Sequence, residues 1–371
     1  MLSISGAAAL AVWLYLILGR GGFWRMRVSP TPVELGPAAP SVTVIIPARN
    51  EESVAGLAVA SLAAQEYSGA FRIVLVDDDS SDGTVAAALR AAPPEMLTVI
   101  HGAPLPAGWT GKLWAVSQGV ADAQKNVPDY LLLTDADIVH PARGLAQLVA
   151  RAESEGYDLV SWMVLLRCQS LAERALIPAF VFFFFLLYPP AWIPSAMRAT
   201  AGAAGGCILI RREMLARIGD IARIRGELID DCALARAVKR SGGQVWLGLS
   251  TEARSIREYG TFRQIGRLIS RAAFAQLRHS VWLLAATVAG LSLTYLAPPL
   301  TACAGNGFGI AAWILMCVAY WPALRFYRRS PLWAPFLPLV AAFYLMATLH
   351  SAISYWRGAG GIWKGRVQDR R

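Results

Sequence analysis

Two aspartates one residue apart, Asp135 and Asp137, follow an apolar run in the stretch YLLLTDADIVH. Along an extended strand, residues two apart point to the same side, so the two carboxylates are expected to converge. Converging carboxylates repel each other unless a cation lies between them. Mg²⁺ or Mn²⁺ suits such oxygen ligands and keeps waters and substrate phosphates as its other ligands. Taken alone, the stretch is equally compatible with a solvated turn.

Acidic residues also end an earlier apolar run, in VLVDDDSSDGT. Asp77, Asp78 and Asp79 follow a predicted strand, and Ser80 to Thr84 offer side chains that suit a turn and a helix cap. A carboxylate at this position could accept hydrogen bonds from a base N–H or a ribose hydroxyl. The alternative is a helix-entry turn without a ligand.

A third acidic pair, Asp230 and Asp231, opens an amphipathic stretch in RGELIDDCALARAVKRSG. The pattern predicts a helix of about ten residues, and acidic side chains near a helix N-terminus are favoured by its dipole. That placement alone would explain both residues. Asp231 is nevertheless a candidate general base.

Two further stretches place polar residues at predicted helix starts. In GWTGKLWAVSQG, Lys112 follows two glycines, and a cation beside free backbone N–H groups could bind phosphate; a solvated lysine is the alternative. In IIPARNEE, Pro47 ends a predicted strand, and Glu51 and Glu52 open a helix. That second stretch is consistent with a plain helix cap.

The elements that must position these residues alternate between short apolar runs and helix-like stretches. The runs are rich in β-branched residues and predict strands; they cover 42–47, 72–77, 97–102 and 130–135. Helices are predicted over 52–65 and 112–124. Such alternation predicts an α/β domain with a mostly parallel sheet and helices on both faces. Ligands of such sheets bind at the carboxyl ends of the strands, where the polar clusters lie.

The composition predicts that part of the chain lies in lipid. Of 371 residues, 56% are hydrophobic and only 16% are charged, against about 25% charged in soluble domains. The apolar run Ile4–Leu18 precedes Arg20, which places the N-terminus outside and the following chain in the cytoplasm. Three more segments are long enough to span a membrane, at 281–300, 308–327 and 332–356.

Two apolar features leave alternatives open. Residues 176–194 lie inside the predicted catalytic region, and an interfacial helix or hairpin is favoured over a full span, with a buried core helix as the alternative. Strict alternation of the spans would put the basic C-terminal residues outside, against the positive-inside rule. Pro335 and Pro338 could instead make the last segment re-entrant or kinked, which would leave the tail cytoplasmic.

The charge and the cysteines exclude several classes of protein. The net charge of +10 comes from scattered arginines without an aromatic-interleaved basic module, so we expect an anionic membrane surface and no nucleic acid as the partner. Five cysteines without a CxxC pair predict neither a disulfide framework nor a zinc site. Reduced thiols suit a cytoplasmic face.

Together, VTVIIPARNEE, VLVDDDSSDGT, GKLWAVSQG, LLLTDADI and IDDCALAR resemble the family 2 inverting glycosyltransferases of the GT-A fold. The flanking apolar segments are similar to those of members that glycosylate lipids, such as ceramide glucosyltransferases and the hopanoid-biosynthesis-associated group. The resemblance implies a Rossmann-like GT-A domain over 41–278, with an anchor at 1–27, a linker at 28–40, membrane helices over 279–357 and a basic tail at 358–371. It also implies a bacterial inner or plasma membrane, with the catalytic domain in the cytoplasm.

The resemblance assigns a role to each matching residue. Asp135 and Asp137 would hold Mg²⁺ or Mn²⁺ on the donor diphosphate, and Asp231 would deprotonate the acceptor hydroxyl, with Asp230 in the place of the usual Glu. The donor, a UDP-type nucleotide sugar, would be bound by Pro47, Ala48, Glu51, Asp78, Lys112 and Asp135. Gln264 and Arg267 match part of the QxxRW motif of processive members, but Leu268 replaces Trp. A single transfer to a lipid acceptor, of hopanoid or sphingolipid-like type, is therefore expected.

Other classes of protein compete with this interpretation. An aspartyl-nucleophile phosphatase would use Asp135 as nucleophile, but its motif usually opens the domain, whereas two strands precede it here. An inactive membrane scaffold of the same fold would not need the acidic residues that are present. A nicotinamide dehydrogenase is disfavoured because no GxGxxG follows the first predicted strand.

Overall fold

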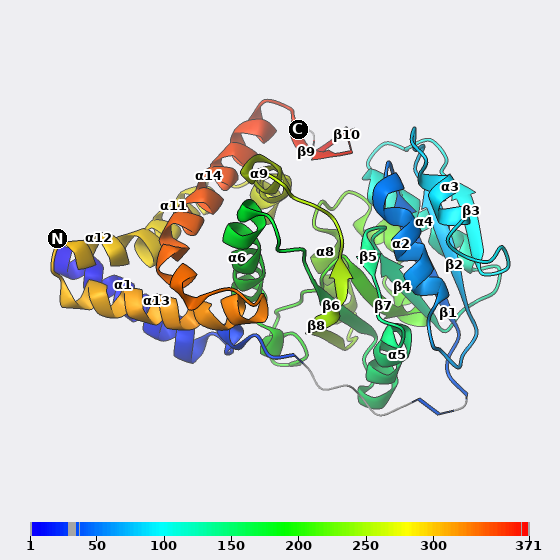
Figure 1. Cartoon of the computed structure of the whole chain (residues 1–371), viewed down its shortest axis with the longest axis horizontal. Helices are drawn as coiled ribbons and strands as arrows, with labels where there is room; N and C mark the ends of the chain where they lie inside the picture. Colours follow the sequence, from blue (N-terminus) through cyan, green and yellow to red (C-terminus); the bar gives the residue numbers. More distant parts are fainter. Residues whose placement is uncertain (1, 29–34, 37, 365, 370–371) are drawn as a thin grey trace.

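The computed structural model describes residues 2–28, 35–36, 38–364 and 366–369. Most of the predicted linker, residues 29–34 and 37, lies outside this part of the chain. Figure 1 places an α/β domain at one end of the molecule and a group of apolar helices at the other. The N-terminal end of the described chain lies at the far end of the helical part (Figure 1), whereas its C-terminal end lies beside the α/β domain.

The first half of the α/β domain is built as the sequence predicts. Strands β1 (Val42–Ala48), β2 (Phe71–Asp77), β3 (Leu97–His101) and β4 (Tyr130–Thr134) pair in parallel in the order β3-β2-β1-β4. Helices α2 (Glu52–Ala63), α3 (Thr84–Leu89) and α4 (Gly111–Ala123) connect them. All seven residues of β1 and all five of β4 are buried, as expected for strands covered on both faces.

The second half makes the eight-stranded sheet mixed, because two of its strands run against the direction of the other strands. Strands β5 (Ile138–Val139), β6 (Leu159–Leu165), β7 (Cys207–Arg211) and β8 (Val245–Ser255) extend it in the order β4-β7-β6-β8-β5. β7 is antiparallel to both β4 and β6, and β5 is antiparallel to β8, while β6 and β8 pair in parallel. The sequence pattern had identified only the first four strands. The short β5 and the antiparallel β7 depart from the regular β/α alternation from which the first four strands are predicted.

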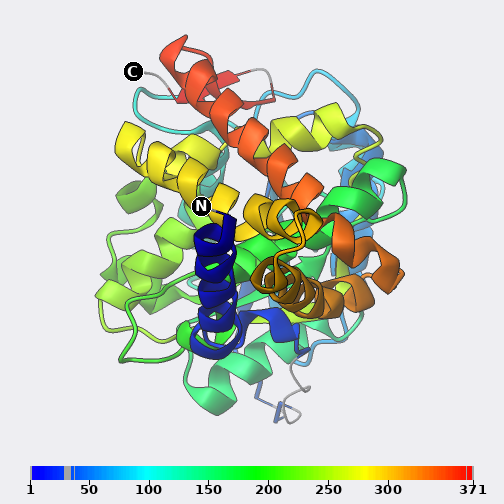
Figure 2. The ribbon, with the colours of Figure 1, turned by 90° about the vertical axis from the view of Figure 1, so that its left-hand side faces the viewer.

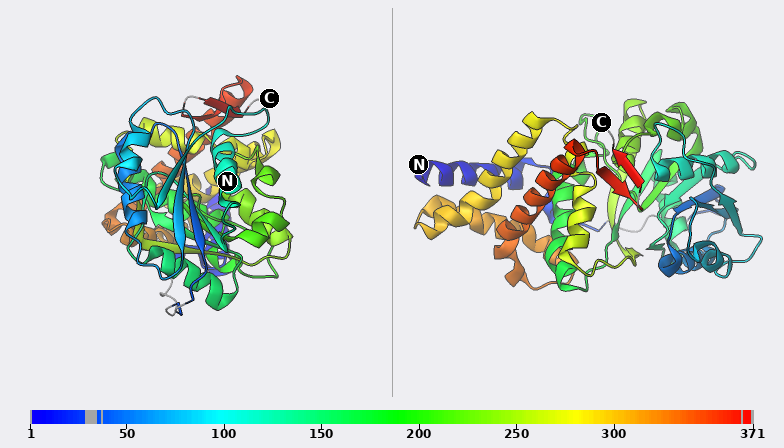
Figure 3. Two further views of the ribbon diagram at one scale, coloured as in Figure 1. Left: turned by 90° about the vertical axis from the view of Figure 1, so that its right-hand side faces the viewer. Right: turned by 90° about the horizontal axis from the view of Figure 1, so that it is seen from above.

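Helices pack on the second half of the sheet, and two short helices lead from it to the apolar helices. α5 (Gly144–Glu155) precedes β6, and α7 (Arg212–Arg217), η3 (Ile221–Ile224) and α8 (Asp230–Arg240) lie between β7 and β8. After β8 come α9 (Phe262–Ser270) and α10 (Ala273–Gln276). Figure 3 shows the sheet edge-on in its left view and the helices projecting from the domain in its right view.

Five helical segments within the described residues are long and apolar enough to cross a membrane. They are α1 (Leu2–Gly19), α6 with η2 (Leu171–Trp192), the segment Val281–Cys303 that begins with α11 (Val281–Leu291), α13 (Gly307–Phe326), and η5 (Pro331–Phe336) with α14 (Leu337–Trp356). A π-helical turn, η4 (Ser292–Leu296), joins α11 to α12 (Ala297–Cys303). Figure 2 looks onto this end, where α1, α12 and α13 lie together.

Helix α6 (Leu171–Leu187) lies between the α/β domain and the other apolar helices (Figure 1). It begins with a capping box in which Ser170 and Glu173 satisfy each other's backbone N–H groups. Phe182 and Phe185 are buried, and the Phe183 ring meets Tyr344 of α14 edge-on at 4.8 Å between centroids. The predicted interfacial segment is thus packed against protein on one side.

The predicted basic tail forms a hairpin in its described part. β9 (Gly360–Trp363) and β10 (Arg366–Asp369) pair antiparallel, with Trp363 opposite Arg366. Arg370 and Arg371 lie outside the described residues. Figure 1 places this hairpin near α2 and the loops of the α/β domain.

Candidate active site

The predicted site residues gather where the carboxyl ends of β1 and β4 meet the start of β7. Parallel pairing aligns Ala48 with Asp77, and antiparallel pairing aligns Thr134 with Cys207. The Asp135 N–H donates to the Gly206 carbonyl at 3.4 Å, which fixes the chain just beyond β4. The sheet therefore brings residues that are far apart in sequence to one edge, as expected for an α/β fold.

Lys112 lies at the centre of the acidic cluster. Its Nζ is 2.9 Å from Asp135 Oδ1 and 3.1 Å from Asp230 Oδ2. Thr110 caps α4 by accepting from the Leu113 N–H, which sets the start of the helix that carries Lys112. Burial disfavours the charge of Lys112, but the neighbouring carboxylates outweigh it and raise its pKa above the ordinary value. Lys112 is therefore a permanent cation.

Asp231 is oriented by two backbone donors. Its Oδ2 accepts from the Gly205 N–H at 2.8 Å, and its Oδ1 accepts from the Cys232 N–H at 2.7 Å. Burial and the adjacent Asp230 carboxylate raise its pKa to about 6, although Lys112 and the two N–H groups act in the opposite direction. Asp231 lines a small cavity of about 20 Å³ whose walls include Pro47, Lys112, Asp135, Asp230 and Ile224.

Asp137 faces a different set of partners from Asp135. β4 ends at Thr134, and Asp137 lies in the turn that follows, so the strand periodicity assumed from the sequence does not extend to it. Asp137 accepts a short hydrogen bond from the Ser255 hydroxyl and lies 3.4 Å from Arg257 Nη2. The two aspartates share the sheet edge, but each has its own cation.

Arg257 is a site residue that the sequence reasoning missed. Its Nη2 lies 2.7 Å from Glu51 Oε1 as well as near Asp137, so it links the start of α2 to the turn after β4. It follows the end of β8, a strand that the alternation pattern did not reveal. The run of polar and charged residues just after that strand was the available signal.

The carboxylates present fit a divalent cation that takes its remaining ligands from substrate. Within the described part of the chain, no group of three or more His, Cys, Asp or Glu side chains is arranged to hold a metal on protein ligands alone. Burial and the nearby Asp137 carboxylate raise the pKa of Asp135, although Lys112 acts in the opposite direction. A divalent ion bound between the two carboxylates would lower that pKa. Mg²⁺ commonly uses one or two carboxylates plus phosphates, so Asp135 and Asp137 suit that role.

The predicted nucleotide-facing residues surround the turn between β1 and α2. Pro47 and Ala48 end β1, and the Glu51 N–H donates to the Thr84 hydroxyl at 2.7 Å. Asp78 is buried, and its carboxylate lies 3.6 Å from the Arg49 guanidinium. This turn and the one after β2 are tied together, so the predicted base and ribose contacts share one wall.

Gln264 and Arg267 are not brought to the acidic cluster by any described contact. Both lie on α9 with exposed side chains, and the Gln264 side chain completes a capping box with Thr261. Helix α9 packs against α14 and α6. Gln264 thus has a structural role as a helix cap in this chain.

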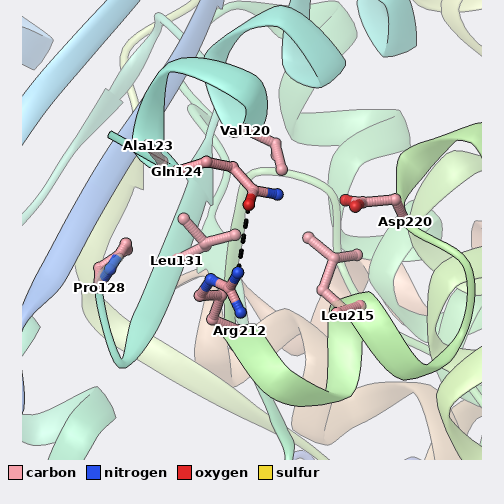
Figure 4. A pocket seen from close by; sticks show the side chains of 9 residues that line it. Val120, Ala123, Gln124, Pro128, Leu131, Arg212, Leu215 and Asp220 are labelled. Atoms are coloured by element: carbon pink, nitrogen blue, oxygen red, sulfur yellow. Dashed lines mark hydrogen bonds between the residues drawn. The ribbon is translucent and has the colours of Figure 1, made fainter. Parts of the chain in front are cut away.

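A second small cavity lies at the opposite end of β4. Figure 4 shows Arg212 donating to Gln124 beside Leu131 and Pro128. Pro128 precedes the start of the strand, so this cavity is separated from Asp135 by the length of β4. Its lining is mostly apolar.

Comparison with known proteins identifies the domain. Residues 43–219 match the family described as Glycosyl transferase family 2. These residues form a family 2 glycosyltransferase domain. The match contains β1 to β7 and both aspartates after β4, and it favours sugar transfer over the phosphatase alternative.

Two similar proteins extend this result. The mannosyltransferase PcManGT from Pyrobaculum calidifontis, solved with GDP-Man and Mn²⁺, is 21% identical; the alignment covers 95% of this chain and 99% of that chain, with a TM-score of 0.57. An N-acetylglucosaminyltransferase of Rhizobium leguminosarum bv. viciae is 43% identical over 72 residues, which is 18% of this chain and 17% of that protein. The family 2 domain thus has a GT-A-like mixed sheet flanked by apolar helices.

Proposed function

We propose that the chain is an inverting glycosyltransferase that moves a sugar from a UDP-type nucleotide sugar to a lipid hydroxyl. The observation that carries the proposal is the Lys112 ammonium between Asp135 and Asp230, with Asp231 beside it, at the carboxyl edge of a family 2 domain. A leaving nucleoside diphosphate and an attacking hydroxyl need a cation and a base at one place, and this cluster supplies both.

In this proposal Asp231 is the base. Two backbone N–H groups hold its carboxylate in one orientation, and with a pKa of about 6 it is mostly ionised at neutral pH. The acceptor hydroxyl becomes acidic as it attacks the anomeric carbon, so Asp231 takes the proton late in the step. One displacement breaks the bond from the sugar to the diphosphate, forms the bond to the acceptor oxygen and inverts the anomeric centre.

The leaving diphosphate is stabilised by cations that the site holds in place. Lys112 is permanently charged and lies in the cavity wall, where it can donate to a phosphate oxygen without reorganisation. Bound at Asp135 and Asp137, Mg²⁺ or Mn²⁺ would neutralise negative charge that grows on the diphosphate as the bond breaks. Glu51, Asp78, Pro47 and Ala48 would orient the base and ribose.

The acceptor is proposed to come from the membrane. A lipid of hopanoid or sphingolipid-like type presents its hydroxyl at the bilayer surface, and α6 and α14 lie between the apolar helices and the α/β domain. The resemblance to lipid-glycosylating members motivates this acceptor class. GDP-mannose belongs in the donor comparison beside UDP-sugars because PcManGT was solved with it.

The sheet supports an interfacial position for α6. β6 precedes this helix and β7 follows it, and the two strands are hydrogen-bonded neighbours. A helix that crossed the bilayer would put them on opposite sides. We therefore propose that α6 lies in the cytoplasmic interface, with Phe182 and Phe185 turned into the protein.

The function is tested by turnover of nucleotide sugars with lipid extract and Mn²⁺. Asp135→Ala and Asp137→Ala should each reduce metal-dependent transfer about 100-fold or more, because each removes a ligand of a transition-state cation. Asp231→Asn should lose transfer to a similar extent and keep donor binding, since the amide is similar in size but cannot take a proton. Transfer at the wild-type rate in all three variants would refute the proposal.

A further inference from the structure

The C-terminal hairpin reaches the wall where the nucleotide is proposed to bind. The Lys364 Nζ donates to the Asn50 carbonyl at 3.0 Å and lies 2.9 Å from Glu51 Oε1. Glu51 is 9% exposed and Lys364 is 24% exposed at their side chains, so the contact is largely shielded from solvent. Both acceptors belong to the turn between β1 and α2, which lies more than 300 residues earlier in the chain.

The backbone on both sides of this contact is unusual. Lys364 has a φ of 46° and Asn50 has a φ of 52°, both in the left-handed region. Asn tolerates that region, whereas a lysine is disfavoured there because its Cβ crowds the backbone. Lys364 follows β9 directly, and Trp363, the last residue of β9, pairs with Arg366, the first residue of β10. The unfavourable backbone conformation of Lys364 at the hairpin turn suggests that its side chain has a role.

The contact is also connected to the proposed metal ligands. Glu51 Oε1 lies 2.9 Å from Lys364 Nζ and 2.7 Å from Arg257 Nη2, and Arg257 in turn approaches Asp137. A carboxylate oxygen has two lone pairs, so these two donors fill Oε1. Two cations and two carboxylates balance in charge, and a nucleotide that needs Glu51 or the Asn50 carbonyl as an acceptor must compete with Lys364.

We propose that the C-terminal hairpin is a gate on the donor pocket. The closed gate is the arrangement in which Lys364 contacts the Asn50 carbonyl and the Glu51 carboxylate; an arriving nucleotide displaces Lys364 and the hairpin leaves the turn. The hairpin directly follows α14, which packs against the interfacial helix α6, so the gate is anchored at the membrane part. This inference rests on the proposed function, in which Glu51 lines the nucleotide pocket.

The first test uses the full-length protein in detergent and follows trypsin cleavage after Lys364 by intact mass. Trypsin must bind the lysine side chain, so docking of Lys364 slows cleavage there. Saturating UDP or GDP with Mn²⁺ is expected to accelerate cleavage after Lys364 several-fold. Cleavage after Lys125, which pairs with Asp122 and is 75% exposed at its side chain, serves as the internal control and should not change. Unchanged or slower cleavage after Lys364 with nucleotide bound would overturn the gate.

The second test measures nucleotide affinity in Lys364→Ala, with Lys125→Ala as the matched control. Removing a competing contact raises the open fraction, so the Kd for the nucleoside diphosphate with Mn²⁺ should fall about three- to tenfold. An unchanged Kd, or a larger one as expected if Lys364 bound the nucleotide, would overturn the gate and leave glycosyl transfer standing. Absence of any nucleotide binding by the wild type would instead refute the proposed function, and the gate with it.

Discussion

At the scale of single residues, the site is a balance of charges around Lys112. The ammonium contacts Asp135 and Asp230 directly and lowers the pKa of Asp231 through space. Burial acts on Asp231 in the opposite direction, and the net pKa of about 6 lies below neutral pH. In the proposed mechanism the same lysine therefore stabilises the leaving group and favours the ionised form of the base.

The pH dependence of donor turnover tests this coupling. The base works when deprotonated, so kcat/KM should fall as the pH drops through about 6. In Lys112→Met the positive charge that lowers the pKa of Asp231 is lost, so the acid limb should move to higher pH, in addition to a loss of rate. The pH profile of Lys125→Met provides the reference, because Lys125 pairs with Asp122 instead. An acid limb at the same pH in Lys112→Met and wild type would contradict the coupling.

At the scale of elements, the helices and strands that a local sequence pattern encodes could be predicted from the sequence. Strands β1 to β4, helices α2, α4 and α8, and the placement of Asp231 near a helix start follow from residue periodicity and caps. Tertiary contacts determined the rest. The antiparallel β7, the Arg257 bridge and the Lys364 contact join segments that share no local pattern, and the periodicity that paired Asp135 with Asp137 ended with β4.

The close packing of α4 against β1 positions Lys112, and a substitution at Gly119 tests it. A Cβ built on Gly119 would lie 2.5 Å from Ile45 Cγ2 of β1, so Gly119→Ala must push the helix that carries Lys112 away from the sheet. We expect a loss of about 1–3 kcal/mol of stability and a reduced rate. Gly290→Ala in α11 is the control, since nothing lies within 4 Å of its Cβ. Thermal unfolding in detergent measures the stability of both variants. A melting temperature of Gly119→Ala equal to that of Gly290→Ala would contradict the close packing of α4 on β1.

At the scale of the whole molecule, the position of the tail bears on the topology that the sequence left open. Strict alternation of four spans put the basic tail outside, whereas a re-entrant last segment kept it in the cytoplasm. Lys364 contacts Glu51 of the family 2 domain, so the chain that follows α14 lies beside that domain. We propose that α1, α11 to α12 and α13 cross the bilayer, while α6 and α14 lie in the interface.

Cysteine labelling in intact cells tests this arrangement. Cys303 is exposed at the end of α12, the turn expected on the outer side, so a membrane-impermeant maleimide should label it without lysis. A cysteine introduced by Arg357→Cys, at the exposed end of α14, should react only after permeabilisation, because a cytoplasmic tail is required for Lys364 to reach Glu51. Cys303→Ser should abolish the first signal and serves as background for the second. Labelling of Arg357→Cys from outside would place the tail across the bilayer from the family 2 domain, and the Lys364 contact could then not form in the cell.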